Sequence, residues 1–134
     1  MAKVRLGKEL AVTVVNKIGV LADMSKILAA EKINIEAVAG YADVNNQAKI
    51  MLVTDNNGRA LEVLKKNNYN NIREAEVVIL DLDNEPGTLK DITAKLGLQN
   101  IDIKYIYGTA CSAGCPAKII LSTIDNTKAA SALK

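Results

Sequence analysis

Residues 16–21 read Asn-Lys-Ile-Gly-Val-Leu, and residues 84–89 read Asn-Glu-Pro-Gly-Thr-Leu. The second stretch lies 68 positions after the first, and further matches on both sides keep this offset. After one inserted residue the offset becomes 69, so that residues 48–54 align with residues 117–123. Ordered matches with a single slip indicate an internal duplication, in which both halves share one fold.

Hydrophobic periodicity predicts the order strand, helix, strand, strand, helix, strand in the first half, and the same order without the last strand in the second. In the first half the strands are expected at residues 10–15, 33–39, 48–54 and 72–76, and the helices at residues 20–31 and 59–67. In the second half the strands are expected at residues 77–82, 101–107 and 118–123, and the helices at residues 89–96 and 126–133. The pattern therefore predicts two units, residues 1–76 and 77–134.

The second half lacks a closing strand in this reading. Ile72-Arg73, just before the second copy, aligns with Val4-Arg5 before the first. We expect residues 2–6 to pair with the open edge of the second half, because an exposed edge invites association. The alternative is that a partner chain covers this edge.

Composition narrows the classes of function. The net charge is only +2, the aromatic fraction is 3%, and there is no histidine. These values argue against nucleic-acid binding, and they remove the commonest general base and metal ligand. No apolar run is long enough to span a membrane, and the N-terminus leads into no signal core. The sequence thus predicts a cytoplasmic protein that is not an enzyme and needs no cofactor.

The element order, the Asn-x-x-Gly turn of residues 16–19 and 84–87, and the strand starts Ile33-Asn34-Ile35 and Ile101-Asp102-Ile103 together resemble the ACT domain. The resemblance covers nearly the whole chain as a tandem pair. It implies an α+β fold of two ferredoxin-like βαββαβ ACT-type units packed side by side, with antiparallel sheets and helices on one face. It also implies a regulatory, allosteric role in which an amino acid binds at an ACT–ACT interface.

The resemblance assigns ligand-binding positions to each copy. They are Asn16, Lys17, Ile18, Gly19, Val20 and Asn34 in the first, and Asn84, Glu85, Pro86, Gly87, Thr88 and Asp102 in the second. A glycine lets backbone approach a ligand, a helix start suits a carboxylate, and an asparagine amide both donates and accepts. The same Asn-x-x-Gly pattern can also serve as a turn alone. The copies differ, since Ile18 stands opposite Pro86 and Asn34 opposite Asp102, so two sites would not be equivalent.

Cys111 and Cys115 lie in the predicted hairpin of the second half, and the first half has no counterpart. Three interpretations are open: a local disulfide, half of a metal site, or idle or weakly redox-active thiols, of which the sequence favours the last. The leading prediction is a non-catalytic module that binds an amino acid or similar small ligand, working as a homodimer. The alternatives are a ligand-free oligomerisation module for an amino-acid biosynthetic enzyme, or a thiol or metal module using the cysteine pair.

Overall fold

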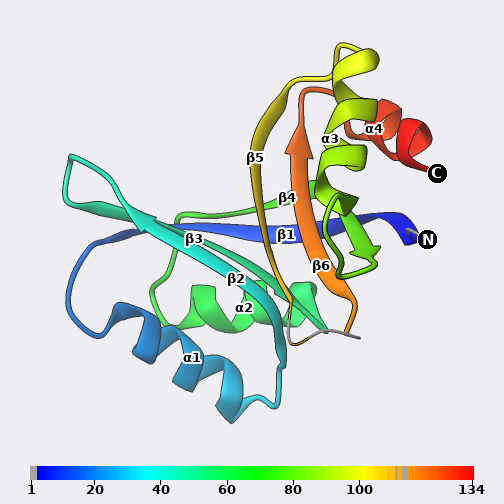
Figure 1. The fold of residues 1–134 in the computed structure, drawn as a ribbon. Coiled ribbons are helices and arrows are strands. Elements are labelled where there is room, and N and C mark those ends of the chain that lie inside the picture. The colour runs from blue at the N-terminus through cyan, green and yellow to red at the C-terminus, as the bar shows by residue number, and fades with distance from the viewer. Residues whose placement is uncertain (1–2, 111, 113–114) are drawn as a thin grey trace. The chain divides into compact units, whose positions relative to one another are not determined.

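A computed structural model describes residues 3–110, 112 and 115–134. Its elements follow one another as β1 (Lys3–Val15), α1 (Val20–Ala30), β2 (Ile35–Ala42), β3 (Gln47–Thr54), α2 (Asn57–Lys66), β4 (Ile72–Leu82), α3 (Thr88–Leu98), β5 (Ile103–Thr109), β6 (Ala117–Thr123) and α4 (Asn126–Leu133) (Figure 1). The predicted α+β architecture with antiparallel strands is confirmed. The chain divides into two compact units: Lys8–Ala75, here called the first unit, and the segment ending at Gly7 together with Glu76–Lys134, here called the second unit.

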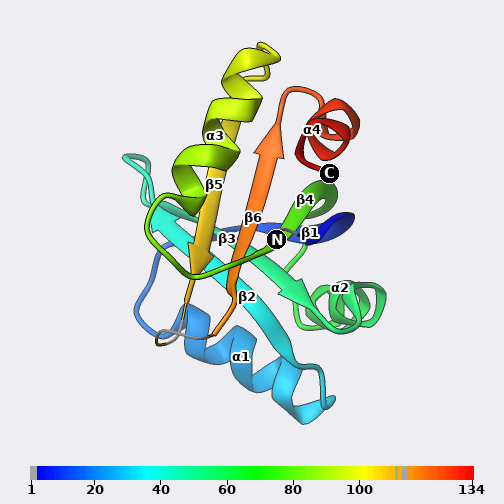
Figure 2. The same ribbon diagram turned by 45° about the vertical axis from the view of Figure 1, so that its right-hand side comes forward.

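In the first unit the strands lie in the order β2-β3-β1-β4, with the start of β4 at one side. β3 pairs antiparallel with β1, for example Leu10 with Leu52, and antiparallel with β2. Because side chains alternate between the two faces of a strand, Leu10 and Val12 point the same way and pack with α1. Helix α1 contributes Val20, Met24 and Leu28, spaced four apart, and Figure 2 shows α1 and α2 beside these strands.

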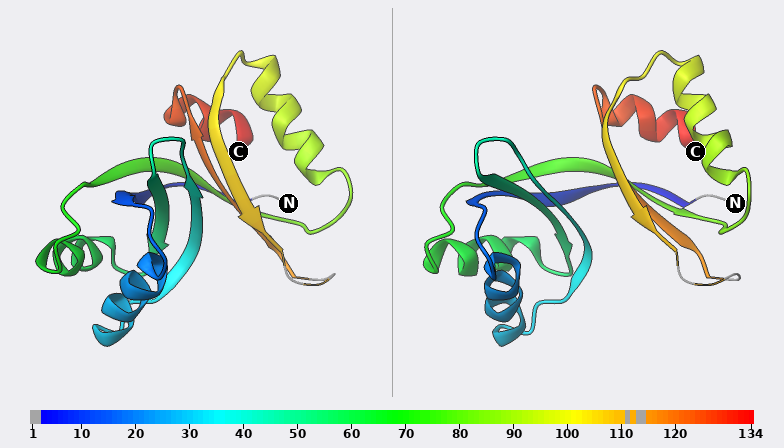
Figure 3. Two further views of the ribbon diagram at one scale, coloured as in Figure 1. Left: turned by 90° about the vertical axis from the view of Figure 1, so that its left-hand side faces the viewer. Right: turned by 60° about the vertical axis from the view of Figure 1, so that its left-hand side comes forward.

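In the second unit the order is β1-β4-β6-β5, where β1 is represented by its first residues. Its buried core joins β4 and β6 to α3 and α4, and Figure 3 shows both helices beside these strands. Val4 packs against this core. A Cβ built on Gly7 would lie 2.4 Å from Cδ1 of Ile79, so glycine permits a close approach of β1 to β4. The division at residues 76 and 77, with N-terminal residues closing the second sheet, stays a prediction that truncation can test.

One hydrogen-bond network begins the second helix of each unit. In the first unit Oδ1 of Asn57 accepts from the backbone N–H of Thr54 at 3.0 Å and from its hydroxyl at 2.7 Å. Nδ2 of Asn57 donates to the carbonyl of Lys8 at 2.9 Å. In the second unit Asn126 makes the same three bonds, to Thr123 and to the carbonyl of Glu76. The duplication has therefore preserved the side-chain bonds that fix this turn, as well as the elements themselves.

Candidate functional site

The two helices of each unit begin differently. Asn56 caps α2 and Asp125 caps α4, each by accepting a backbone N–H with its side chain. Helices α1 and α3 begin at Gly19 and Gly87, and among the described residues no side chain caps either start. The first backbone N–H groups of a helix have no partner within the helix and carry its positive dipole end. Both predicted loops therefore end on a helix start suited to an anion such as a carboxylate.

The glycines of these loops are required by backbone conformation. Gly19 has φ 88° and Gly87 has φ 94°, which side-chain-bearing residues rarely adopt. A Cβ built on either would meet no described atom within 4 Å. The space beside each helix start is therefore open, and the loop residues Lys17 and Ile18 are exposed.

The structure holds Asn16 and Asn34 at opposite ends of the first unit's strands. The backbone N–H of Asn16 donates to the carbonyl of Asn46, just before β3, at 2.9 Å. Asn34 exchanges bonds with Asp55, just after β3: its N–H donates to Oδ1 at 3.0 Å and its carbonyl accepts the Asp55 N–H at 3.1 Å. Their partners Asn46 and Asp55 flank β3 and are nine residues apart, which separates the two asparagines by roughly 30 Å along the strand at the usual rise. They do not meet within this unit.

The second copy has the same separation and a different loop. Asp102 accepts from the N–H of Ile124, just after β6, through its carbonyl at 3.0 Å. Nδ2 of Asn84 donates to the carbonyl of Ser112 at 3.2 Å, so its amide contacts the hairpin between β5 and β6. Asn16 instead contacts the hairpin between β2 and β3 through its backbone N–H, which donates to the carbonyl of Asn46. The two predicted sites thus hold their first asparagine in different ways.

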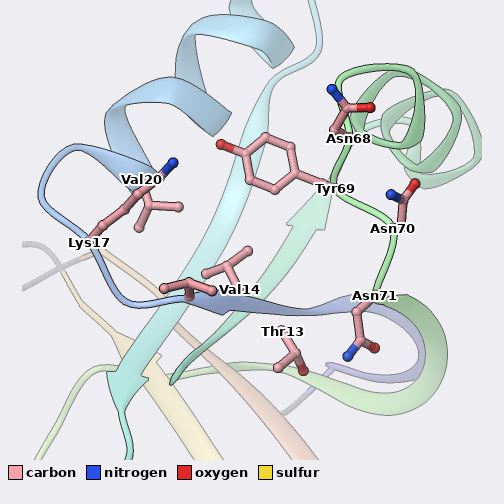
Figure 4. Close-up of a pocket in the computed structure, with 9 residues that line it drawn as sticks. Thr13, Val14, Lys17, Val20, Asn68, Tyr69, Asn70 and Asn71 are labelled. Carbon is pink, nitrogen blue, oxygen red and sulfur yellow. The ribbon is translucent and has the colours of Figure 1, made fainter. Parts of the chain in front are cut away.

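A hollow of about 330 Å³ opens beside the start of α1 in the first unit (Figure 4). Two of the predicted positions, Lys17 and Val20, line it. Its other described lining residues are Thr13, Val14 and Val15 on β1 and Asn68, Tyr69, Asn70 and Asn71 between α2 and β4. Sequence reasoning missed this second group. The run Asn67-Asn68-Tyr69-Asn70-Asn71 was the available signal, because so many amides are unusual in a simple turn.

Tyr69 links the connection between α2 and β4 to the first turn of α1. Its hydroxyl donates a hydrogen bond to Oδ2 of Asp23, and in Figure 4 the hydroxyl is directed toward α1. Burial, followed by the hydrogen bond to Asp23 and the charge of that carboxylate, raises the pKa of Tyr69 to about 12. The phenol is protonated at neutral pH, and the raised pKa extends its role as a donor to a pH above 10.

The cysteine pair requires a correction. Cys115 is disulfide-bonded, and no described cysteine is free, so the interpretation as idle thiols is wrong for this structure. Cys111, the other cysteine of the sequence, lies outside the described residues. The N–H of Cys115 donates to the carbonyl of Ser112 at 3.1 Å, a tight turn that suits a local bridge. A bridged sulfur is not a thiolate, so in this state Cys115 cannot serve as a metal ligand.

Within the described ranges, no group of three or more histidine, cysteine, aspartate or glutamate side chains could hold a metal ion. The helices described here include none with the length and apolar character needed to cross a membrane.

The chain belongs to the ACT domain pair family, whose model it matches over residues 5–133. Its structure is similar to the crystal structure of protein BT0572 from Bacteroides thetaiotaomicron, with a TM-score of 0.86 at 23% identity over 96% of this chain and 86% of that one. It is also similar to the ligand-free regulatory subunit of aspartate kinase from Thermus thermophilus, with a TM-score of 0.67 at 12% identity over 97% of this chain and 93% of that one.

Aspartate kinase from Clostridium acetobutylicum is similar over 99% of this chain and 34% of that one, with a TM-score of 0.56 at 16% identity. No curated protein matches the sequence. At these identities the solved structures show a shared fold. The resemblance to a tandem ACT pair is thus confirmed, and the fold is shared with a regulatory subunit of aspartate kinase.

Proposed function

We propose that this chain is a non-catalytic regulatory module that binds an amino acid, or a similar small zwitterion, at an interface between ACT units. The observation that carries the proposal is the contrast between helix starts: α1 and α3 begin uncapped beside open space, whereas α2 and α4 are capped by side chains. Free helix N–H groups hold a carboxylate well. Membership of the ACT pair family supports an amino acid as the ligand.

The separation of Asn16 from Asn34 supports an interface site. Roughly 30 Å along the strand is far longer than any free amino acid. If both asparagines contact one ligand, the second must come from a further ACT unit. A homodimer would supply it, and ligand binding would then stabilise the assembled state and shift the population toward it.

The regulated partner would be an enzyme of amino-acid biosynthesis. The shared fold with a regulatory subunit of aspartate kinase supports this class of partner. We place the protein in the cytoplasm, where such enzymes meet free amino acids. The absence of histidine from the sequence is consistent with a module that leaves catalysis to its partner.

Thermal-shift measurements with each of the twenty amino acids test the proposal. A ligand present at 100 times its dissociation constant stabilises the folded state by about 2.7 kcal/mol. We expect at least one amino acid to raise the melting temperature, and Asn16→Ala or Asn84→Ala to remove the rise. Asn45→Ala, in the exposed hairpin between β2 and β3, is the matched control. If no amino acid changes the melting temperature, the proposal is wrong.

A second candidate is a ligand-free association module. Ile18 is fully exposed at the tip of the first loop, and Val15 and Leu21 beside it are about half exposed. Exposed apolar side chains grouped around one loop favour a protein contact. Light scattering of the native chain and of Ile18→Asp tests this. If the native chain is a dimer and the variant a monomer, and if no amino acid changes the melting temperature of the native chain, association is the function.

A further inference from the structure

The hollow beside α1 has two walls from distant parts of the first unit's sequence. One wall is the end of β1 with the loop that follows, and the other is the connection between α2 and β4. Its volume of about 330 Å³ lies near the lower end of the range of small-molecule sites, about 300–1,000 Å³. The cavity is therefore of a size for a single small metabolite.

Backbone bonds hold the second wall in place. The N–H of Asn68 donates to the carbonyl of Lys65 at 3.1 Å, and the N–H of Tyr69 to that of Leu64 at 3.0 Å. The carbonyl of Asn71 accepts the N–H of Thr13 at 2.9 Å, which ties this wall to the first. With the bond from Tyr69 to Asp23, both walls are fixed before any ligand arrives. A site held ready in this way loses little affinity to ordering on binding.

The lining has one kind of charge. Lys17 is the cation among the described lining residues, and no carboxylate stands beside it in that set. Thr13 and the asparagines offer neutral donors and acceptors, while Val14 and Val20 are apolar. A ligand carboxylate would be satisfied by Lys17, whereas a second charged group of either sign on its side chain would find no ionic partner among these residues.

We propose that this hollow is the first unit's side of the interface site for the amino acid, and that it selects an amino acid with an uncharged side chain. The carboxylate binds Lys17 at the start of α1, the ammonium meets the amide oxygens of the asparagine wall, and the side chain lies against Val14 and Val20. This inference rests on the proposed function and deepens it, because it adds Asn68–Asn71 to the site and names the class of amino acid that the hollow accepts.

Isothermal titration calorimetry on the full chain tests the site. Every one of the twenty amino acids is titrated into the native protein, and the best ligand is then titrated into Lys17→Met and Asn70→Ala. We expect each substitution to raise the dissociation constant about tenfold, the loss typical of one hydrogen bond to a charged group. Lys65→Met and Asn45→Ala, a lysine and an asparagine outside the lining, should stay within about twofold of the native chain.

The outcomes separate this inference from the proposed function. If an amino acid binds and Asn16→Ala or Asn84→Ala abolishes it, while Lys17→Met and Asn70→Ala bind normally, the hollow is not the site and the proposed function stands. Tighter binding of aspartate, glutamate, lysine or arginine than of every uncharged amino acid overturns the selectivity. If none of the twenty binds, both fail. Shifts of the Asn70 and Asn71 amide signals in nuclear magnetic resonance, on adding the best ligand, would place it in the hollow directly.

Discussion

Replacing Asn57 with alanine should destabilise the first unit by about 2–3 kcal/mol. The substitution removes the acceptor of the Thr54 N–H and hydroxyl and the donor to the Lys8 carbonyl. Thr54 is 7% exposed, so water cannot replace the lost partner fully. An unsatisfied buried polar group costs about 1–3 kcal/mol. The Thr54 hydroxyl can rotate to another partner, and alanine favours a helix slightly. The total loss of stability from the three missing hydrogen bonds therefore stays at about 2–3 kcal/mol.

Two companion variants separate the causes. Asn57→Asp keeps the two acceptor bonds, loses the donor to Lys8 and places a carboxylate at a helix start, so we expect a loss of only about 1 kcal/mol. Asn56→Ala removes a single capping bond, to the N–H of Arg59 at 3.1 Å, and should also cost about 1 kcal/mol. Urea denaturation followed by circular dichroism measures all three. If Asn57→Ala is no more destabilising than Asn56→Ala, the network does not stabilise the fold as argued.

Four further measurements probe other features. Gly19→Ala forces φ 88° on a side-chain-bearing residue and should cost about 1–2 kcal/mol, measured by urea denaturation; an unchanged midpoint would contradict the stated need for glycine. The pKa of Tyr69 is raised from 10.0 to about 12, so the stability that its hydroxyl contributes should be full below pH 10 and should vanish as the pH rises through 12. The difference in unfolding free energy between the native chain and Tyr69→Phe should therefore fall across that range. A constant difference would contradict this reasoning. Deleting residues 1–7 should lower the stability of the second unit, because Val4 packs against its core. Equal thermal stability and solubility would show that the N-terminal residues do not cover the edge of the second unit's sheet. Alkylation without reductant should label no cysteine, and alkylation after reduction should label two, as counted by mass spectrometry. Two labels without reductant would restore the interpretation as free thiols.

The repeated turn and the alternating strands could be predicted from sequence because both are local signals. The positions Gly19 and Gly87 follow from turn chemistry, and the structure shows the positive φ angles that explain them. Apolar periodicity identified α1 and β3 because each buries one face. These features need no knowledge of which segments meet in space.

The second wall of the hollow could not be predicted in this way. Asn70 and Asn71 are separated from Lys17 by more than fifty residues, and nothing in their local pattern says that the two segments are neighbours. The pairing of Asn57 with Lys8 is hidden for the same reason. Gly7 lies between Leu6 and Lys8 in one continuous strand, β1. Its role depends on Ile79, which sequence alone does not place beside it.

The membership of the N-terminal segment in the second unit has a consequence for synthesis. Residues leave the ribosome in order, at about 5–20 per second. The segment ending at Gly7 emerges before residues 8–75, yet the rest of its unit begins at Glu76. Residues 8–75 can thus fold into most of their own unit before the remaining residues of the second unit, from Glu76 on, have been synthesised. During that time Val4 and Leu6 have no partner strand. A chaperone or a slow stretch of translation would have its largest effect during this interval, when the first residues of β1 are exposed without their partner strands.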